Sequence, residues 1–239
     1  MCGRYVVPKT DGLASLFDVD LLAENLPEPT FNARPSFSLT DPEPPVPVIV
    51  EAIPDDDRLV RRMEPGFWSY IPSWAKELPR NTFNAVSEEA ASKPTWKAAV
   101  KSKRCVVPAA AYYEAGGRGK NAYRYAFAHP GDEVLPLAGL WRWWRPAPDA
   151  PWLLTFAILT IPSPTPGIAA VHHRSPLVLD RGLVDTWLDP RQAGDQAFLD
   201  MAATRAADLV SGLRFWEVAR LDVNSEEMLA PRVDASPLL

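Results

Sequence analysis

The sequence lacks the features that hold many secreted and membrane proteins together. Its 239 residues include only two cysteines, Cys2 and Cys105, too few for a disulfide scaffold. No apolar run approaches the roughly 18 residues that a membrane span requires. The first residues are not followed by the apolar core of a signal peptide. We therefore expect a cytoplasmic protein that does not contact a membrane.

Glycine is also scarce, and the chain has no excess of positive charge. The chain has 12 glycines against 26 prolines, and so much proline shortens helices and argues against a helical bundle. No glycine-rich phosphate loop and no CxxC pair occurs, and Cys105 has no partner nearby in sequence, so neither a metal nor a cofactor is expected. Because the net charge is −5, contact with a polyanion depends on a local basic groove.

What is present is an ordinary globular composition, 47% hydrophobic and 23% charged. Apolar periodicity predicts strands and helices along the whole chain, with no linker and no repeat. We expect strands at 2–8, 46–53, 58–63, 104–107, 111–114, 123–128, 137–141, 152–161 and 213–218, helices at 12–26, 88–101 and 193–213, and an extended loop at 27–47. Residues 1–239 are thus expected to form a single α+β domain with a β-rich core.

Cys2 is the first candidate for chemistry. If Met1 is removed, Cys2 presents an α-amine with a pKa of about 7.8 beside a thiol. Such an amine attacks an aldehyde to give a Schiff base, and the tethered thiol then closes a thiazolidine ring. We expect both groups to face an open cleft. The alternative is a small buried hydrophobic residue with no chemical role.

Three further residues each have a functional and a plain interpretation. Glu114 follows two tyrosines and apolar residues, where desolvation raises a carboxyl pKa and suits proton transfer; alternatively it is a solvated strand end. Asn84 can orient a terminal amine or cap the helix that follows it. His172 lies in a histidine–histidine–arginine segment that suits a phosphate or a developing oxyanion, or it belongs to a surface loop.

Aromatic and basic residues supply candidates for contact with nucleic acid. Trp68 and Trp74 are two of nine tryptophans, and exposed rings of this kind can stack on unpaired bases, although most will be core residues. Arg4 lies two residues from Cys2, close enough to hold a phosphate beside it.

Together these segments resemble one family, the SOS-response-associated peptidase (SRAP) domain proteins. The matching blocks run in order along nearly the whole chain: residues 1–5 (MCGRY), 31–35 (FNARP), 68–75 (WSYIPSWA), 83–88 (FNAVSE), 93–94 (KP), 104–108 (RCVVP), 113–114 (YE), 138–141 (AGLW), 158–160 (ILT) and 171–176 (VHHRSP). The resemblance implies a compact α+β domain with a curved, barrel-like β core flanked by helices. It also implies a groove for single-stranded DNA that contains abasic sites.

The resemblance assigns roles at matching positions. Cys2 would be the nucleophile, Asn84 would position its amine, Glu114 would assist sugar ring opening and proton transfers, and His172 would act near the sugar and its phosphate. The residues expected to contact DNA are Arg4, Asn32, Trp68, Thr160 and Arg174. The family also implies peptidase removal of Met1 and lyase activity, in a protein expected to be a monomer in the DNA damage response.

Several positions depart from the family pattern. Val86 stands where the family usually has arginine, and Ala115 replaces a tryptophan, so a phosphate contact and an aromatic wall are missing. Ser69 and Tyr70 replace glycine and leucine, and His173 replaces aspartate. The four central positions are retained, so the sequence supports the chemistry better than the affinity for DNA.

Two other functions remain open. One is an autoprocessing cysteine peptidase or hydrolase in which Cys2, His172 and Asn84 act as nucleophile, base and orienting residue. The other is a non-catalytic single-stranded DNA-binding module, whose reversible and salt-sensitive binding survives loss of Cys2.

Overall fold

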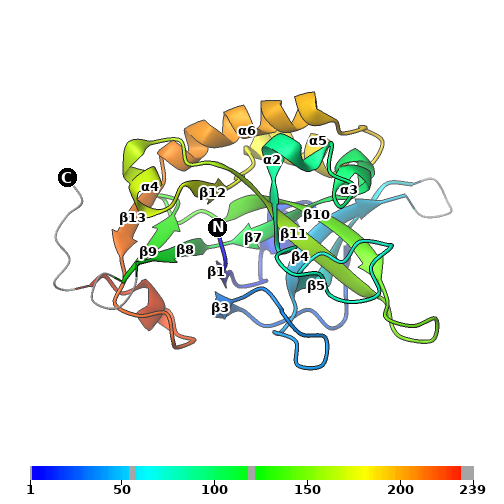
Figure 1. Cartoon of the computed structure of the whole chain (residues 1–239), viewed down its shortest axis with the longest axis horizontal. Coiled ribbons are helices and arrows are strands. Elements are labelled where there is room, and N and C mark those ends of the chain that lie inside the picture. Colours follow the sequence, from blue (N-terminus) through cyan, green and yellow to red (C-terminus); the bar gives the residue numbers. More distant parts are fainter. Residues whose placement is uncertain (1, 54–57, 118–121, 233–239) are drawn as a thin grey trace.

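A computed structural model describes residues 2–53, 58–117 and 122–232. Strands dominate these residues, and Figure 1 shows them as two sheets beneath a layer of helices. The strands are β1 (Tyr5–Val7), β2 (Leu21–Leu22), β3 (Thr30–Ala33), β4 (Val46–Ala52), β5 (Val60–Trp68), β6 (Asn84–Val86), β7 (Arg104–Ala109), β8 (Ala111–Gly116), β9 (Tyr123–Ala128), β10 (Leu135–Trp144), β11 (Leu153–Pro162), β12 (Arg174–Pro176) and β13 (Arg214–Glu217).

The larger sheet closes on itself. Its order is β12-β11-β10-β7-β4-β5-β2, and β11 also pairs in parallel with β5 and β6. The strands β4, β5, β11, β10 and β7 therefore form a closed ring in the described chain. Gly66 lies where the ring closes, paired with Val46 on one side and Leu154 on the other. A Cβ at Gly66 would lie 2.4 Å from Val48 Cγ2, so only glycine allows this close approach.

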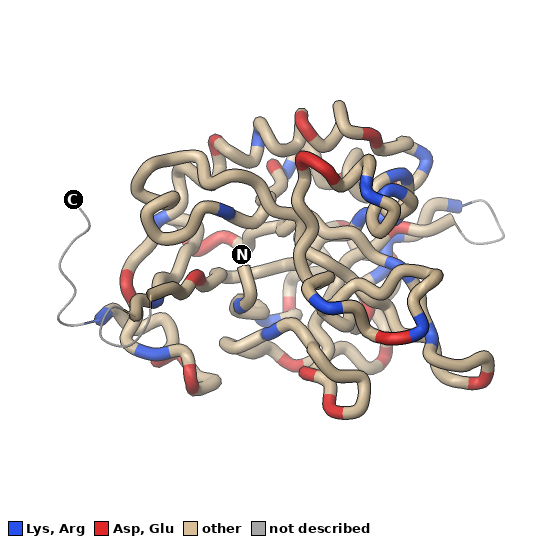
Figure 2. Tube along the Cα trace, viewed as in Figure 1, with Lys and Arg blue, Asp and Glu red and all other residues tan. Residues whose placement is uncertain are grey.

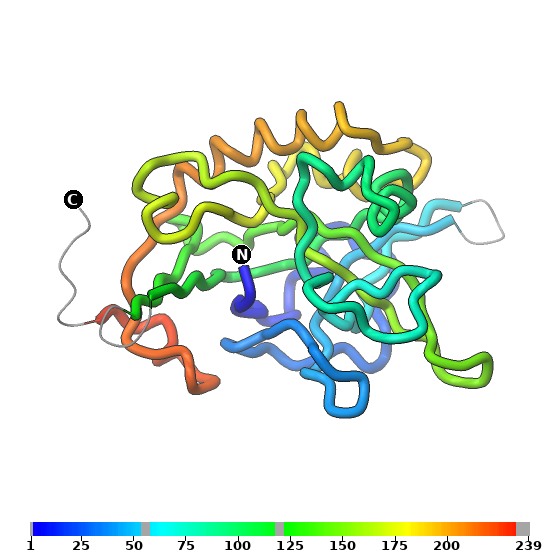
Figure 3. The backbone as a smooth tube through the Cα atoms, in the orientation of Figure 1, coloured from blue at the N-terminus to red at the C-terminus, as the bar shows by residue number. Residues whose placement is uncertain are grey.

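The smaller sheet carries the start of the chain. Its order is β13-β9-β8-β1-β3, with β1 pairing antiparallel to both β3 and β8. Figure 3 shows that the chain after β13, orange to red, runs below the green strands β8 and β9. A hydrogen bond from Arg4 to the Leu221 carbonyl joins this last segment to the start of the chain.

The helices are short except for one. They are α1 (Leu13–Leu16), α2 (Ser87–Ala90), α3 (Lys97–Ser102), α4 (Pro166–Val171), α5 (Val184–Leu188) and α6 (Gln196–Ser211), with 3-10 turns η2 (Arg181–Leu183) and η3 (Glu226–Leu229). Asp195 caps α6 by accepting from Phe198 N at 2.8 Å. The buried face of α6, which includes Leu199 and Val210, packs on the main core, and the helix lies along the top of Figure 1.

The predicted single α+β domain with a curved, barrel-like core is confirmed by the closed ring. The helix predicted at 12–26 is wrong: α1 ends at Leu16, and Asp18 has φ 50°. Leu21 and Leu22 form a strand on β5. The helix predicted at 88–101 is divided into α2 and α3, with Pro94 between them. The predicted loop at 27–47 contains β3, which the pairing with β1 holds.

Charged side chains are spread along the trace. Figure 2 shows Lys and Arg on most of the elements rather than on one face, interspersed with Asp and Glu. Within the described ranges, no helix is both long and apolar enough to cross a membrane.

Candidate active site

Cys2 lies in the middle of the molecule, immediately before β1. It has no exposed surface and belongs to the main hydrophobic core, and its thiol donates to the Arg4 carbonyl at 3.7 Å. Burial and the negative charge of Glu114 raise the pKa of this thiol well above its ordinary value. The expectation of an open cleft at Cys2 is therefore wrong. Since β1 pairs on both edges, it draws the preceding residue into the interior.

Asn84 is held against Cys2. It begins β6, is 6% exposed, and donates its side-chain Nδ2 to the Cys2 carbonyl at 2.7 Å. Its Oδ1 is buried and accepts no hydrogen bond from the residues that the structure describes. Because a buried acceptor without a partner is costly, this atom is suited to receive an N–H that arrives with processing or with substrate. The alternative role as a helix cap is not observed, because α2 has no side-chain cap.

Glu114 lies on β8, next to the strand that follows Cys2. The Arg4 carbonyl accepts from Tyr113 N at 2.9 Å, which places the strand carrying Glu114 directly beside the start of β1. The carboxyl is 4% exposed, and burial raises its pKa to about 7. The alternative of a solvated strand end is excluded, and a carboxyl that titrates near neutral pH suits both uptake and release of a proton.

His172 follows α4, the helix that packs against β8. Its Nδ1 lies 3.0 Å from both the backbone N and the carbonyl O of Arg174, which fixes the orientation of the half-buried ring. Burial lowers the pKa of this imidazole, so it is neutral at pH 7. The Ser163 hydroxyl donates to the His172 carbonyl at 2.7 Å and further holds the segment.

Of the five residues predicted to contact DNA, three are buried. Trp68 is 3% exposed, stacks on Phe156 with ring centroids 6.3 Å apart, and donates its indole N–H to the Phe83 carbonyl. Thr160 is fully buried. Its hydroxyl accepts from Arg174 at 3.1 Å. The prediction of Trp68 as an exposed stacking ring is wrong, because its indole fills the core where β5 pairs with β11.

Arg174 is tied up by an ion pair. Its two terminal nitrogens donate to the two Glu88 carboxylate oxygens at 2.5 and 2.9 Å, and this pair lowers the pKa of Glu88 to about 2. Only 9% of Arg174 is exposed. The guanidinium therefore joins β12 to α2 and Thr160 rather than facing solvent, and the expectation that it contacts DNA does not hold for this arrangement.

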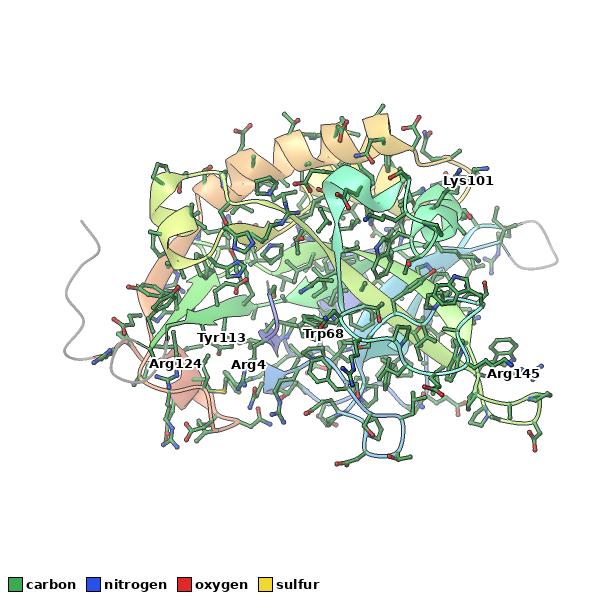
Figure 4. All side chains as sticks on the ribbon, in the orientation of Figure 1. Arg4, Trp68, Lys101, Tyr113, Arg124 and Arg145 are labelled. Atoms are coloured by element: carbon green, nitrogen blue, oxygen red, sulfur yellow. The ribbon has the colours of Figure 1, made fainter. Side chains whose placement is uncertain are left out.

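Arg4 and Asn32 form the half-buried margin of the site. Arg4 Nη1 donates to Asn32 Oδ1 at 2.9 Å, and Asn32 Nδ2 donates to the Val223 carbonyl at 3.0 Å. Figure 4 shows Arg4 beside Tyr113 and Arg124, with Trp68 further inward. Sequence reasoning missed Arg124, whose only signal is a cation near the start of an otherwise uncharged strand. Trp74, 66% exposed, offers the ring face that Trp68 does not.

The structure is thus a single α+β domain with a closed ring of strands, in which the second residue is a buried cysteine bonded to Asn84. The chain belongs to the SOS response associated peptidase (SRAP) family, whose pattern matches residues 1–225.

Named relatives and solved structures extend this assignment. The "Abasic site processing protein YoqW" of Bacillus subtilis is 26% identical over 238 residues and covers 98% of both chains. The "Abasic site processing protein HMCES" of Gallus gallus is 32% identical over 147 residues, which is 51% of this chain and 44% of that protein. A crystal structure of a Bordetella bronchiseptica protein has a TM-score of 0.66 at 21% identity, covering 92% of this chain and 100% of the other. At 21% identity, this similarity shows that the two chains share a fold.

Proposed function

We propose that this chain captures abasic sites in single-stranded DNA through a thiazolidine that Cys2 forms once Met1 has been removed. The observation that carries the proposal is the contact of Cys2 with Asn84 beside a buried carboxyl whose pKa is about 7. The names of the relatives in Bacillus subtilis and Gallus gallus supply the substrate class. The family description supplies the SOS response.

The chemistry proceeds through the amine first. The neutral Cys2 amine attacks the aldehyde carbon of the ring-opened sugar, and loss of water gives an imine. The thiol then adds to the imine carbon and its proton passes to nitrogen, so that aldehyde, amine and thiol yield the thiazolidine and one water. Since burial raises the thiol pKa, the sulfur is a poor first nucleophile, and the tether between the two groups supplies the second step.

The residues around Cys2 have separate roles in proton transfer, in positioning Cys2 and in binding the DNA. Glu114, titrating near pH 7, receives the proton of the attacking amine and returns one to the departing water. Asn84 holds the Cys2 carbonyl and offers its unpaired Oδ1 to the amine. Neutral His172 lies over β8 next to the sugar and its phosphate. Arg4 binds the phosphate, and the exposed Trp74 provides a face for base stacking.

Removal of Met1 is the step that must open the buried site. A chain that keeps Met1 has no free Cys2 amine, and its thiol is sealed in the core. We expect only the processed chain to react. A cysteine peptidase acting on other substrates is less favoured, because a hydrolytic cysteine needs a lowered thiol pKa, whereas burial raises this one.

The test is a covalent complex that survives heat and detergent. Wild-type protein incubated with a single-stranded oligonucleotide that contains one abasic site should give a shifted band and, by intact mass spectrometry, lack Met1 and gain the oligonucleotide mass minus one water. Cys2→Ala should abolish the complex. Cys2→Ser should leave only an imine that borohydride traps, because the oxazolidine is less stable.

A matched control is Cys105→Ala. Cys105 is the other cysteine, buried in β7, and its loss should leave the covalent complex intact. A complex that persists in Cys2→Ala, or none with processed wild type, contradicts the proposal. Reversible binding that survives Cys2→Ala while wild type never crosslinks would instead support a non-catalytic DNA-binding module.

A further inference from the structure

A cleft of about 520 Å³ opens beside the site on the Ala115 side. It is lined by Arg4, Ala115, Arg124 and residues 219–222. Ala115 follows Glu114 directly on β8. Arg124 on the neighbouring strand β9 pairs with Ala115, so the two side chains lie side by side on the same face of the sheet. The cleft therefore begins one residue along β8 from the proposed catalytic carboxyl, but on the opposite face of the strand, which it shares with Tyr113. Figure 4 shows Arg4, Tyr113 and Arg124 together there.

The charges of this cleft are not balanced within it. Arg4 is half-buried and donates to neutral acceptors, Asn32 Oδ1 and the Leu221 carbonyl, with no carboxylate among these bonds. Arg124 is also half-buried and has no hydrogen-bond or ion-pair partner among the described residues. Burial and the nearby charges of Arg34 and Arg124 lower the pKa of Arg4, which reports mutual repulsion of the guanidinium groups.

Asp222, the acidic residue at the margin, interacts with Arg124 but is hydrogen-bonded to Arg220. Asp222 is exposed and accepts two bonds from Arg220, at 2.7 and 3.1 Å, within its own turn. Among the residues that line the cleft, three guanidinium groups (Arg4, Arg124 and Arg220) thus face a single carboxylate, Asp222. Guanidinium groups match phosphate geometry. A bound anion would also offset the cost of holding half-buried cations close together.

We propose that this cleft is a phosphodiester subsite, in which Arg124 together with Arg4 binds the DNA backbone next to the abasic nucleotide, entering over the small side chain of Ala115. The inference rests on the proposed function for its ligand, single-stranded DNA. It gives this chain a cationic contact on β9, on the far side of Cys2 from Val86. A large residue at position 115 would close the entrance, so Ala115 determines whether the strand can take this path.

The first test measures reversible binding to undamaged single-stranded DNA in a Cys2→Ala background, by fluorescence anisotropy between 50 and 200 mM NaCl. Each phosphate contact contributes about 0.7 to the slope of log K against log salt. Arg124→Gln should therefore reduce the slope by about 0.7, so that its affinity loss is about threefold greater at 50 mM than at 200 mM salt. Asp222→Asn, which removes a negative charge at the margin, should change affinity in the opposite direction.

Arg145→Gln is the matched control. Arg145 stacks over the Trp152 ring at 4.5 Å, and Figure 4 places it on the opposite side of the molecule from Arg124. Its substitution removes the same charge and should leave the slope unchanged. A slope that Arg124→Gln does not change, or that both variants reduce equally, overturns the subsite.

A second test locates the contact on the strand. Oligonucleotides with one neutral methylphosphonate linkage, moved stepwise from the abasic position, should include one linkage that weakens binding to the parent protein but not to Arg124→Gln. If no linkage depends on Arg124, the proposal fails. Crosslinking by wild type is scored separately. Normal crosslinking with no effect of Arg124 rejects the subsite alone, whereas an Arg124-dependent slope without crosslinking rejects the covalent function alone.

Discussion

The regions around Arg104 and Cys2 differ in whether their buried polar atoms have hydrogen-bond partners. Arg104 is 1% exposed, and its guanidinium donates at 2.6 to 2.8 Å to the carbonyls of Val100, Lys101, Trp187, Asp189 and Gln192. Around Cys2, among the described residues, the hydroxyl of Tyr5 and Oδ1 of Asn84 are buried without a hydrogen bond.

The difference separates a structural region from a functional one. A buried polar atom without a partner costs about 1–3 kcal/mol, and native proteins contain few of them. Arg104 shows that this chain can satisfy even a buried charge completely. Under the proposed function, the unsatisfied atoms on β1 and β6 are where stability is given up for the reaction with a substrate.

Loss of Arg104 should have the largest effect on stability. Arg104→Met removes hydrogen bonds to five carbonyls that join α3, α5 and the following loop to β7, and leaves those carbonyls buried. We expect the free energy of unfolding to fall by roughly 4 kcal/mol, measured by urea denaturation at constant m-value. Arg191→Gln, whose side chain is 61% exposed, should leave the free energy of unfolding almost unchanged. A loss below about 1 kcal/mol for Arg104→Met would contradict the structural role of this region.

Glu114 should make the Cys2 region respond to pH. Its folded pKa of about 7 lies above the unfolded value of about 4.3, so between these values the folded chain holds a proton that the unfolded chain has released. Stability is therefore greatest below about pH 4.3 as far as this group is concerned, and is lost as pH rises toward 7. The full change is about 4 kcal/mol.

Glu114→Gln is the comparison that isolates this contribution. The variant keeps the shape of the side chain but cannot ionise, so its unfolding free energy should fall less than that of wild type between pH 5 and 8. The readout is the urea midpoint at each pH. Parallel pH profiles for the two proteins would show that Glu114 has no raised pKa in the folded chain.

The strands of the core were predictable from sequence because their side chains are buried on both faces or alternate regularly. The predicted range 123–128 coincides with β9, and 152–161 differs from β11 by one residue at each end. The segment 12–26 was not predictable in the same way. Its leucines have helical spacing, but Leu21 and Leu22 are exposed at 49% and 55% and are held by pairing with β5, a contact with residues about 40 positions away.

Contacts between residues far apart in the sequence also limited what could be predicted of the candidate site. Glu114 follows a buried run, and that local pattern was enough to predict its raised pKa. Trp68 and Arg174 also have suggestive local sequence, yet Phe156 and Glu88 decide that one ring is buried and that one guanidinium is paired. The burial of Cys2 follows from the pairing of β1 with both neighbours, which no feature of the first residues reveals.

Asn84 should show the smallest effect on stability and a specific effect on rate. Asn84→Ala removes one hydrogen bond to Cys2, but it also removes a buried acceptor that had no partner, so the net change in unfolding free energy should stay below about 1 kcal/mol. The crosslinking rate at saturating abasic DNA should fall about 30-fold, equivalent to about 2 kcal/mol, because the Cys2 backbone is no longer held. Ser69→Ala is the counterpart: Ser69 is 2% exposed, and its hydroxyl donates to the Ser36 carbonyl at 2.7 Å, so its loss should cost about 1 kcal/mol and leave the rate unchanged. If Asn84→Ala reduced stability as Ser69→Ala does and left the rate intact, the unsatisfied atoms around Cys2 would be a feature of packing and not of the reaction.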